Sequence, residues 1–131
     1  MAHTILVVED NPNIRRFIRT TLELEGYQVQ AVPTLQEGLA SARRAQPDLI
    51  LLDLALPDGT GWDFLEAMQT RPETRTVRVA MLTASADHGM AARALAAGAV
   101  AFITKPIAAG ELVAHVRQAL AAHRAAPKRS D

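Results

Sequence analysis

Residues 48–59 read DLILLDLALPDG, and this stretch decides the fold. The apolar run at 49–52 is continuous rather than alternating, which is typical of a parallel β-strand buried on both faces. The run stops at Asp53, and Pro57, Asp58 and Gly59 then predict a turn. A buried strand therefore ends in a carboxylate at the start of a loop.

Similar apolar runs recur along the chain, separated by amphipathic helix patterns. They lie at residues 5–8, 79–82 and 100–103, and a weaker strand is expected near a sheet edge at 27–31. Five strands that alternate with five helices over short connections predict an α/β fold. Its parallel sheet is expected to be doubly wound, with helices on both faces.

Local signals place the helices. Asn11 followed by Pro12 is typical of a helix start, and Thr34 with Glu37 predicts a capping box at the second helix. The first helix is expected to bury one apolar stripe, made of Ile14, Phe17, Ile18 and Leu22. The fourth helix is expected to run from about Asp87 to Ala97.

Composition limits the classes of function. The chain has 131 residues, and we expect a domain over residues 1–124 with a tail or the start of a linker at 125–131. There is no cysteine, so disulfides and thiolate metal sites are excluded. The 14 basic and 14 acidic residues balance, which argues against direct nucleic-acid binding. Without a signal-peptide pattern or an apolar run of membrane length, we expect a cytoplasmic protein that does not bind membranes.

Polar residues follow the apolar runs at their carboxyl ends, namely Glu9, Asp10, Asp53, Thr83 and Lys105. In open parallel sheets, ligand sites lie outside these strand ends. Neighbouring strands are only about 4.8 Å apart, so Asp10 and Asp53 repel each other unless a cation intervenes. Such oxygen ligands suit Mg²⁺, or Mn²⁺ in its place. Lys105 and Thr83 add the cation and the hydroxyl that phosphoryl transfer requires.

Four motifs carry a family resemblance: Glu9-Asp10-Asn11, Asp53 within residues 52–59, Thr83-Ala84 and Lys105-Pro106. In identity, order and spacing they resemble the motifs of bacterial two-component response-regulator receiver domains, the CheY-like family. The resemblance spans residue 4 to about residue 123. It implies a flavodoxin-like fold of five β-α units with strand order 2-1-3-4-5.

The resemblance also implies roles for the acidic residues. Asp53 is expected to accept a phosphoryl group from a phosphohistidine of a sensor histidine kinase or a histidine phosphotransfer protein. Asp10, Asp53 and the backbone carbonyl of Ala55 are implied ligands of Mg²⁺, and Glu9 is expected to act mostly through a water.

A conformational switch is implied as well. The resemblance implies that Lys105 pairs with the phosphoryl oxygens, that Thr83 moves toward them and Phe102 rotates inward behind it, and that the Lys105–Pro106 bond is cis. The fourth helix, fifth strand and fifth helix then present an altered face to an unidentified effector protein. A phosphorylation-dependent homodimer is compatible with the family, although residues 98–102 lack the acidic pair of its winged-helix transcription-factor members.

Other classes remain open from the residues alone. A haloacid-dehalogenase-like phosphatase also uses an aspartate nucleophile, but it needs a second aspartate at the position of Ala55 as proton carrier. A flavodoxin-like nucleotide-binding module is a further alternative, although no glycine-rich phosphate loop follows the first strand. A degenerate receiver is disfavoured by the intact site. We therefore expect a signalling domain and not an enzyme, with at most self-catalysed phosphotransfer and autodephosphorylation.

Overall fold

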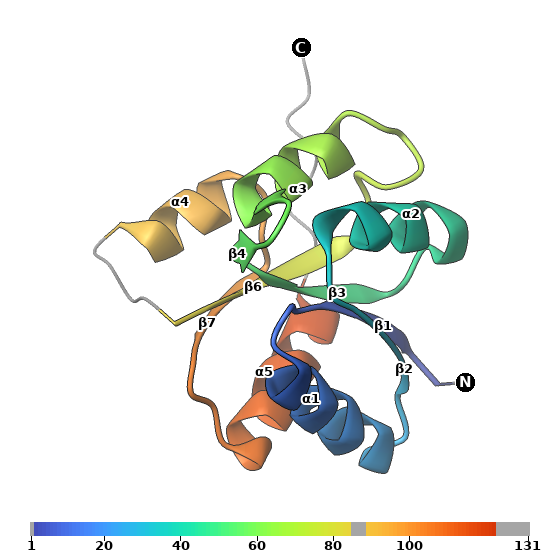
Figure 1. The fold of residues 1–131 in the computed structure, drawn as a ribbon, viewed down its shortest axis with the longest axis vertical. Helices are drawn as coiled ribbons and strands as arrows, with labels where there is room; N and C mark the ends of the chain where they lie inside the picture. Colours follow the sequence, from blue (N-terminus) through green and yellow to red (C-terminus); the bar gives the residue numbers. More distant parts are fainter. Residues whose placement is uncertain (1, 85–88, 123–131) are drawn as a thin grey trace.

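The computed structural model describes residues 2–84 and 89–122. Five parallel strands form one sheet in the order β2-β1-β3-β6-β7 (Figure 1). Their bounds are Thr4–Val8 (β1), Gln28–Val32 (β2), Leu49–Asp53 (β3), Arg78–Thr83 (β6) and Ala101–Thr104 (β7). Counted along the chain, this is the expected order 2-1-3-4-5, and the predicted fold is confirmed. The weak strand near residue 27 is β2, at the edge of the sheet.

Helices cover both faces of this sheet. In Figure 1, α1 and α5 lie on one face, and α2, α3 and α4 lie on the other. Their bounds are Pro12–Leu24 (α1), Leu35–Ala45 (α2), Gly61–Gln69 (α3), Met90–Ala96 (α4) and Ala109–Ala121 (α5). Because neighbouring parallel strands run in the same direction, each needs a crossover, and the helices provide it.

The central strands divide their side chains between two apolar cores. Leu52 and Met81 belong to the core under α2, α3 and α4, whereas Leu51 and Leu82 belong to the core under α1 and α5. All four side chains are fully buried. A strand with a core on each face needs apolar residues at every position, which explains the continuous runs in the sequence.

The start of α1 agrees with its sequence signals. Asn11 is the N-cap, and its side-chain oxygen accepts hydrogen bonds from the backbone N–H groups of Asn13 and Ile14 at 2.9 and 3.1 Å. Pro12 occupies the first helical position. The acidic residues that precede Asn11 are therefore held at a defined helix entry.

The start of α2 differs from the prediction. Thr34 caps the helix by accepting from the N–H of Glu37 at 3.1 Å, but the carboxylate of Glu37 accepts the Thr34 hydroxyl rather than its backbone N–H. The capping box is therefore only half formed. Asp58, from the loop after β3, accepts from the N–H groups of Leu35 and Gln36 at 2.8 and 3.0 Å. A distant carboxylate thus completes this helix start.

Two other features depart from the sequence-based expectations. A short antiparallel hairpin, β4 (Ala55–Leu56) with β5 (Gly59–Thr60), follows β3. Phe17 is 38% exposed, because the buried side of α1 is centred on Ile18 and Leu22, one turn apart. The expected α4 start at Asp87 and the proposed boundary between residues 124 and 125 lie outside the described residues, and α4 begins at Met90.

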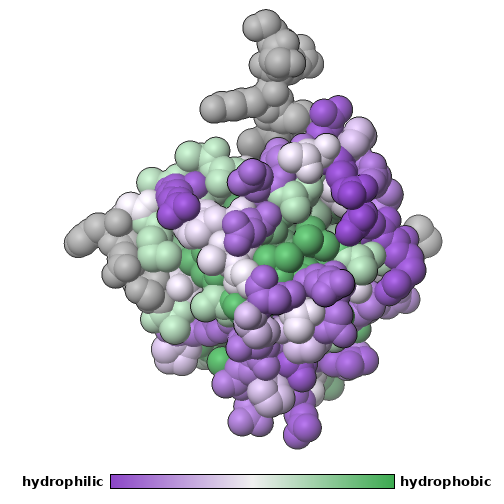
Figure 2. Space-filling view, turned by 45° about the horizontal axis from the view of Figure 1, so that its top comes forward, coloured by the Kyte–Doolittle hydropathy of each residue, from purple (hydrophilic) through white to green (hydrophobic). Residues whose placement is uncertain are grey.

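The face of the molecule drawn in Figure 2 carries many polar residues. Figure 2 shows hydrophilic residues over most of one face, with apolar residues gathered in separate patches between them. Among the helices of residues 2–84 and 89–122, none has both the length and the apolar character needed to cross a membrane.

A prediction follows from the Asp58 contact. The N–H groups of Leu35 and then Gln36 lower the pKa of Asp58 below its ordinary 3.8. We expect Asp58→Ala to lower Tm at neutral pH, because the first turn of α2 loses its carboxylate acceptor. A carboxyl group whose pKa is lower in the folded than in the unfolded chain stabilises the fold at pH values above its unfolded-state pKa. This contribution is lost as the pH falls through the folded-state pKa.

The measurement is thermal unfolding of wild type and Asp58→Ala from neutral pH to below 3.8. The gap in Tm is expected to narrow on acidification. Asp58→Asn is the matched control, since it keeps one oxygen acceptor without the charge and should lose less. A gap of constant size over this pH range would show that the carboxylate contributes nothing specific.

Candidate functional site

The carboxyl ends of the central strands meet in one pocket. Asp53 and Thr83 are the last residues of β3 and β6, while Glu9 and Asp10 follow β1, and Lys105 follows β7. The pocket has a volume of about 560 Å³, and all five of these residues line it. Residues that are up to 96 positions apart in the chain thus share one cavity, as their places at the strand ends predicted.

Lys105 is the cation of this pocket. Its Nζ lies 2.6 Å from Glu9 Oε1 and 3.1 Å from Asp53 Oδ2. The Glu9 residue is completely buried and Asp53 is 5% exposed. Burying a carboxylate is costly unless it is paired and hydrogen-bonded, so Lys105 is what allows both acids to remain inside.

The protonation of the site follows from this burial. Burial raises the pKa of Glu9 from 4.5 to about 7, although the hydrogen bond from Lys105 opposes the change. Burial alone lowers the pKa of Lys105, but the Glu9 hydrogen bond and the Asp53 charge outweigh it, and the net pKa is raised. Lys105 therefore stays cationic at neutral pH, whereas Glu9 gains or loses its proton near pH 7.

The acidic groups could hold a metal ion. One carboxylate oxygen from each of Glu9, Asp10 and Asp53 lies within 4.8 Å of the other two. Asp10 is exposed at the pocket rim. Ala55 also lines the pocket, and its N–H donates to Asp53 Oδ1 at 3.2 Å. Hard oxygen donors at this spacing fit a small divalent cation.

The two expected switch residues lie in different surroundings. Thr83 is buried at 5% exposure and lines the pocket. Phe102 is half-buried, pairs with Met81 in the register of β6 and β7, and packs against the core under α2, α3 and α4. The structure therefore brings Thr83, but not Phe102, into the pocket. The Lys105–Pro106 peptide bond at its edge is cis.

Sequence reasoning missed one contributor to the pocket. Arg15, on α1, donates from Nη1 to the backbone carbonyls of Glu9 at 2.9 Å and Asp10 at 3.2 Å. The N–H of Asn11 also donates to Glu9 Oε2 at 3.1 Å. The only available signal was a basic side chain one turn into α1, and amphipathic patterning assigns such a residue to the solvent face.

A second hollow adjoins the first. It has a volume of about 550 Å³ and shares Ile14, Ala84 and Lys105 with the acidic pocket. Phe17, Pro106 and Ile107 make the rest of its wall largely apolar. The exposed Phe17 of α1 therefore stands beside the acidic pocket.

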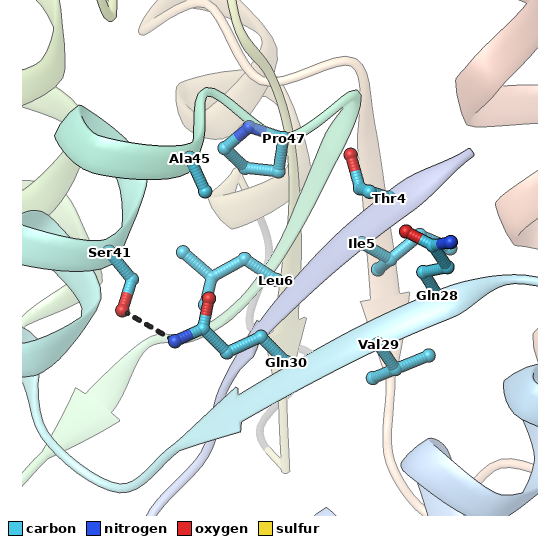
Figure 3. Close-up of a pocket in the computed structure, with 9 residues that line it drawn as sticks. All are labelled: Thr4, Ile5, Leu6, Gln28, Val29, Gln30, Ser41, Ala45 and Pro47. Atoms are coloured by element: carbon cyan, nitrogen blue, oxygen red, sulfur yellow. Dashed lines mark hydrogen bonds between the residues drawn. The ribbon is translucent and has the colours of Figure 1, made fainter. Parts of the chain in front are cut away.

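A third hollow lies at the opposite ends of the strands. Figure 3 shows β1 and β2 forming its floor beside α2, with the Gln30 amide donating to Ser41 at 3.2 Å. Its volume is about 260 Å³. None of the residues predicted for the site lines it, so the candidate chemistry stays at the carboxyl ends.

Comparison with known proteins identifies the class. Residues 5–117 match the response regulator receiver domain family, and the chain belongs to this family. It is 44% identical over 121 residues to the KDP operon transcriptional regulatory protein KdpE of Escherichia coli K12, with 92% of this chain and 52% of KdpE covered. It is 38% identical to the phosphate regulon transcriptional regulatory protein PhoB of the same strain, with 89% and 51% covered.

The fold likeness extends to solved structures. The chemotaxis response regulator CheY4 of Vibrio cholerae superposes with a TM-score of 0.85 at 27% identity, over 91% of this chain and 99% of CheY4. This chain spans about half the length of the two curated relatives. The predicted family and fold are confirmed, and the chain is a receiver domain of two-component signalling.

One expectation needs correction. Direct nucleic-acid binding was not expected, yet KdpE and PhoB are both named as transcriptional regulatory proteins. The balanced charge of this chain describes only the region that it shares with them, which is about half of each relative. Charge balance over that region therefore does not argue against nucleic-acid binding by this class of regulator.

The raised pKa of Glu9 gives a testable pH dependence. Without metal, the unfolded chain releases the Glu9 proton near 4.5 and the folded chain near 7. The contribution of Glu9 to folding is therefore full below 4.5 and is lost as the pH rises to about 7. We expect the free energy of unfolding of wild type, relative to Glu9→Gln, to decrease across this range.

Urea unfolding in the presence of a chelator measures this difference at several pH values. Glu9→Gln keeps the shape and one oxygen acceptor but cannot titrate, so the difference between the two proteins isolates Glu9. Parallel stability curves for the two proteins would mean that Glu9 titrates as an ordinary exposed glutamate.

Proposed function

We propose that this receiver domain is a phosphorylation-activated switch that accepts its phosphoryl group on Asp53. The donor is a phosphohistidine of a sensor histidine kinase or a histidine phosphotransfer protein. One observation carries the proposal: the Asp53 carboxylate is nearly buried, yet it faces an open pocket beside the Lys105 ammonium. A charged oxygen nucleophile next to a fixed cation suits phosphoryl transfer.

The acidic cluster fits Mg²⁺, with Mn²⁺ as a substitute. The donor set supports this choice because it consists of carboxylates, without histidine or cysteine. We assign Asp10, Asp53 and the carbonyl of Ala55 as direct ligands, and Glu9 as a ligand through water. When bound, the ion neutralises charge on the carboxylates and on the phosphoryl oxygens.

The chain's own residues prepare the transfer. The Ala55 N–H and the Lys105 ammonium hold the two oxygens of Asp53, so the carboxylate has one orientation toward the pocket. A carboxylate oxygen bonds to phosphorus as the P–N bond breaks, and the ring nitrogen of the histidine keeps the bonding electrons. Lys105 then pairs with phosphoryl oxygens, which it can do at little cost because it is already held at the pocket.

A switch is favoured over a turnover enzyme. A phosphoaspartate phosphatase needs an acid/base group beside its nucleophile, and Ala55 offers only a methyl group at the corresponding position. We therefore assign the domain no substrate turnover beyond self-catalysed phosphotransfer and autodephosphorylation. The phosphorylated state is the signal.

We assign the response to Thr83 and Phe102. The Thr83 hydroxyl lies at the pocket wall and moves to the phosphoryl group, and Phe102 fills the space behind it. The two act by stabilising an active conformer that the unmodified domain populates weakly. The face made by α4, β7 and α5 then binds an effector protein or a second copy of the chain.

The likeness to KdpE and PhoB extends this proposal to output. We propose that the domain controls transcription in the cytoplasm, through a DNA-binding part or partner beyond residues 5–117. The receiver contributes the switch in this proposal.

We further propose that the phosphodonor docks on the hollow around Phe17. This hollow shares Ile14, Ala84 and Lys105 with the acidic pocket, so a bound helix there would lie beside Asp53. An exposed aromatic side chain beside a reactive centre is a typical binding anchor. A small phosphodonor such as acetyl phosphate needs no docking surface, so the hollow around Phe17 should not affect its reaction.

The first test is labelling by acetyl phosphate. We expect Mg²⁺-dependent phosphorylation at Asp53, found by mass spectrometry after borohydride reduction, and none in Asp53→Asn, because the nucleophilic oxygen is lost. Thr83→Ala is the matched variant: it should still be labelled, but the phosphorylation-induced NMR shifts of Phe102 should shrink. Labelling of Asp53→Asn at the wild-type rate would refute the assignment of the acceptor.

The second test separates docking from chemistry. Phe17→Ala should lower kcat/KM for transfer from a phosphorylated kinase domain that phosphorylates wild type, by about 10-fold or more if Phe17 anchors the complex. Labelling by acetyl phosphate should not change. Leu95→Ala is the control, since it removes an exposed apolar side chain from α4. Equal losses with both donors would place the effect in the acidic pocket and not in docking.

A further inference from the structure

Arg15 occupies an unfavourable place for a cation. It lies one turn into α1, a helix whose first turn carries no acidic residue. The helix dipole is positive at this end, so a guanidinium here is disfavoured unless something else holds it. Arg15 is half-buried and folds back past the helix start, where its Nη1 donates to the carbonyls of Glu9 and Asp10.

The Glu9-Asp10 turn that Arg15 holds places carboxylates close to one another, and these groups repel each other. Glu9, Asp10 and Asp53 bring three carboxylate oxygens within 4.8 Å of one another. Lys105 pairs with Glu9 and Asp53, whereas Asp10 stands at the exposed rim. Repulsion therefore acts to swing the Glu9-Asp10 backbone away from β3.

Contacts from several elements oppose this movement, and Lys105 and the N–H of Asn11 hold the Glu9 carboxylate. The N–H of Glu9 donates to Val32 O at 3.0 Å, which fixes the turn where it leaves β1. Beyond that point, Arg15 holds two consecutive carbonyls from one nitrogen. Each carbonyl belongs to the peptide plane that follows its side chain, so holding both carbonyls restrains the backbone from which the Glu9 and Asp10 side chains leave.

We propose that Arg15 is a positioning residue that holds the Glu9-Asp10 turn in the geometry for divalent-cation binding. The inference rests on the proposed function of the acidic pocket. It assigns Arg15 no contact with the ion or the phosphoryl group, since the bonds of its Nη1 go to the backbone carbonyls of Glu9 and Asp10.

Charge and geometry predict opposite results, which makes the proposal testable. If Arg15 acted only as a nearby positive charge, removing it would strengthen Mg²⁺ binding. If it acts by holding the turn, removing it weakens Mg²⁺ binding, as the loss of groups that orient metal ligands commonly does. The sign of the change therefore decides between the two.

The experiment is calorimetric titration of the full chain with MgCl₂. We expect Arg15→Met, which keeps an unbranched side chain without donors, to raise Kd for Mg²⁺ on the order of 10-fold. Arg15→Lys should recover most of this loss, because a single ammonium can donate to both carbonyls. Arg16→Met removes an exposed positive charge from the neighbouring position of α1, and it should leave Kd unchanged or slightly lower.

Each outcome decides the matter. Unchanged or tighter Mg²⁺ binding by Arg15→Met overturns the inference, as does failure of Arg15→Lys to recover binding. A wild-type chain that does not bind Mg²⁺ overturns it too. Acetyl phosphate labelling of wild type separates the two proposals, because a chain that binds Mg²⁺ with the expected dependence on Arg15 but is never labelled at Asp53 refutes the function and leaves the role of Arg15 standing.

Discussion

The structure depends on one buried interaction, the pairing of the Lys105 ammonium with the carboxylates of Glu9 and Asp53. These groups come from three different strand ends, and their attraction ties the end of β7 to β1 and β3 across the sheet. Without Lys105, burying these two carboxylates beside each other would be costly. The sheet order that brings the three ends together is thus also what makes their burial possible.

Under the proposed phosphorylation of Asp53, the same pairing explains how the modification would act as a signal. Lys105 already donates hydrogen bonds to two acidic side chains, Glu9 and Asp53. A phosphoryl group on Asp53 adds more negative charge at the point where the cation is held. The ammonium must then redistribute its hydrogen bonds, and any hydroxyl that can reach the new oxygens gains a partner. We propose that Thr83, which lines the pocket, supplies this hydroxyl.

Much of the fold and most of the acidic pocket could be predicted from the sequence. Continuous apolar runs specify a doubly covered parallel sheet, and parallel strands necessarily deliver their carboxyl ends to one edge. Asp53 and Lys105 could be placed in one pocket for this reason alone. Such arguments use only the strand period and the chain direction, and these are properties of local sequence.

The features that could not be predicted depend on contacts between segments. Asp58 completes the start of α2 from 22 or 23 residues away, and no local capping rule anticipates it. Phe17 fits the apolar stripe of α1, but its exposure depends on where the helix sits on the sheet. Arg15 looks like a solvated cation, because backbone carbonyls carry no signature in the sequence.

Arg15 and Phe17 give the two sides of α1 different roles. Arg15 and Phe17 are two positions apart, about 200° around the helix, so they leave it in nearly opposite directions. One side of α1 holds the acidic turn, and the other stands at the hollow beside Lys105. A donor protein that presses on the Phe17 side therefore bears on the same rigid element that orients Glu9 and Asp10. Under the proposed function and the proposed role of Arg15, docking and cation binding would be coupled through the position of α1, and a partner that positions α1 would favour the reactive geometry as well as deliver the phosphoryl group.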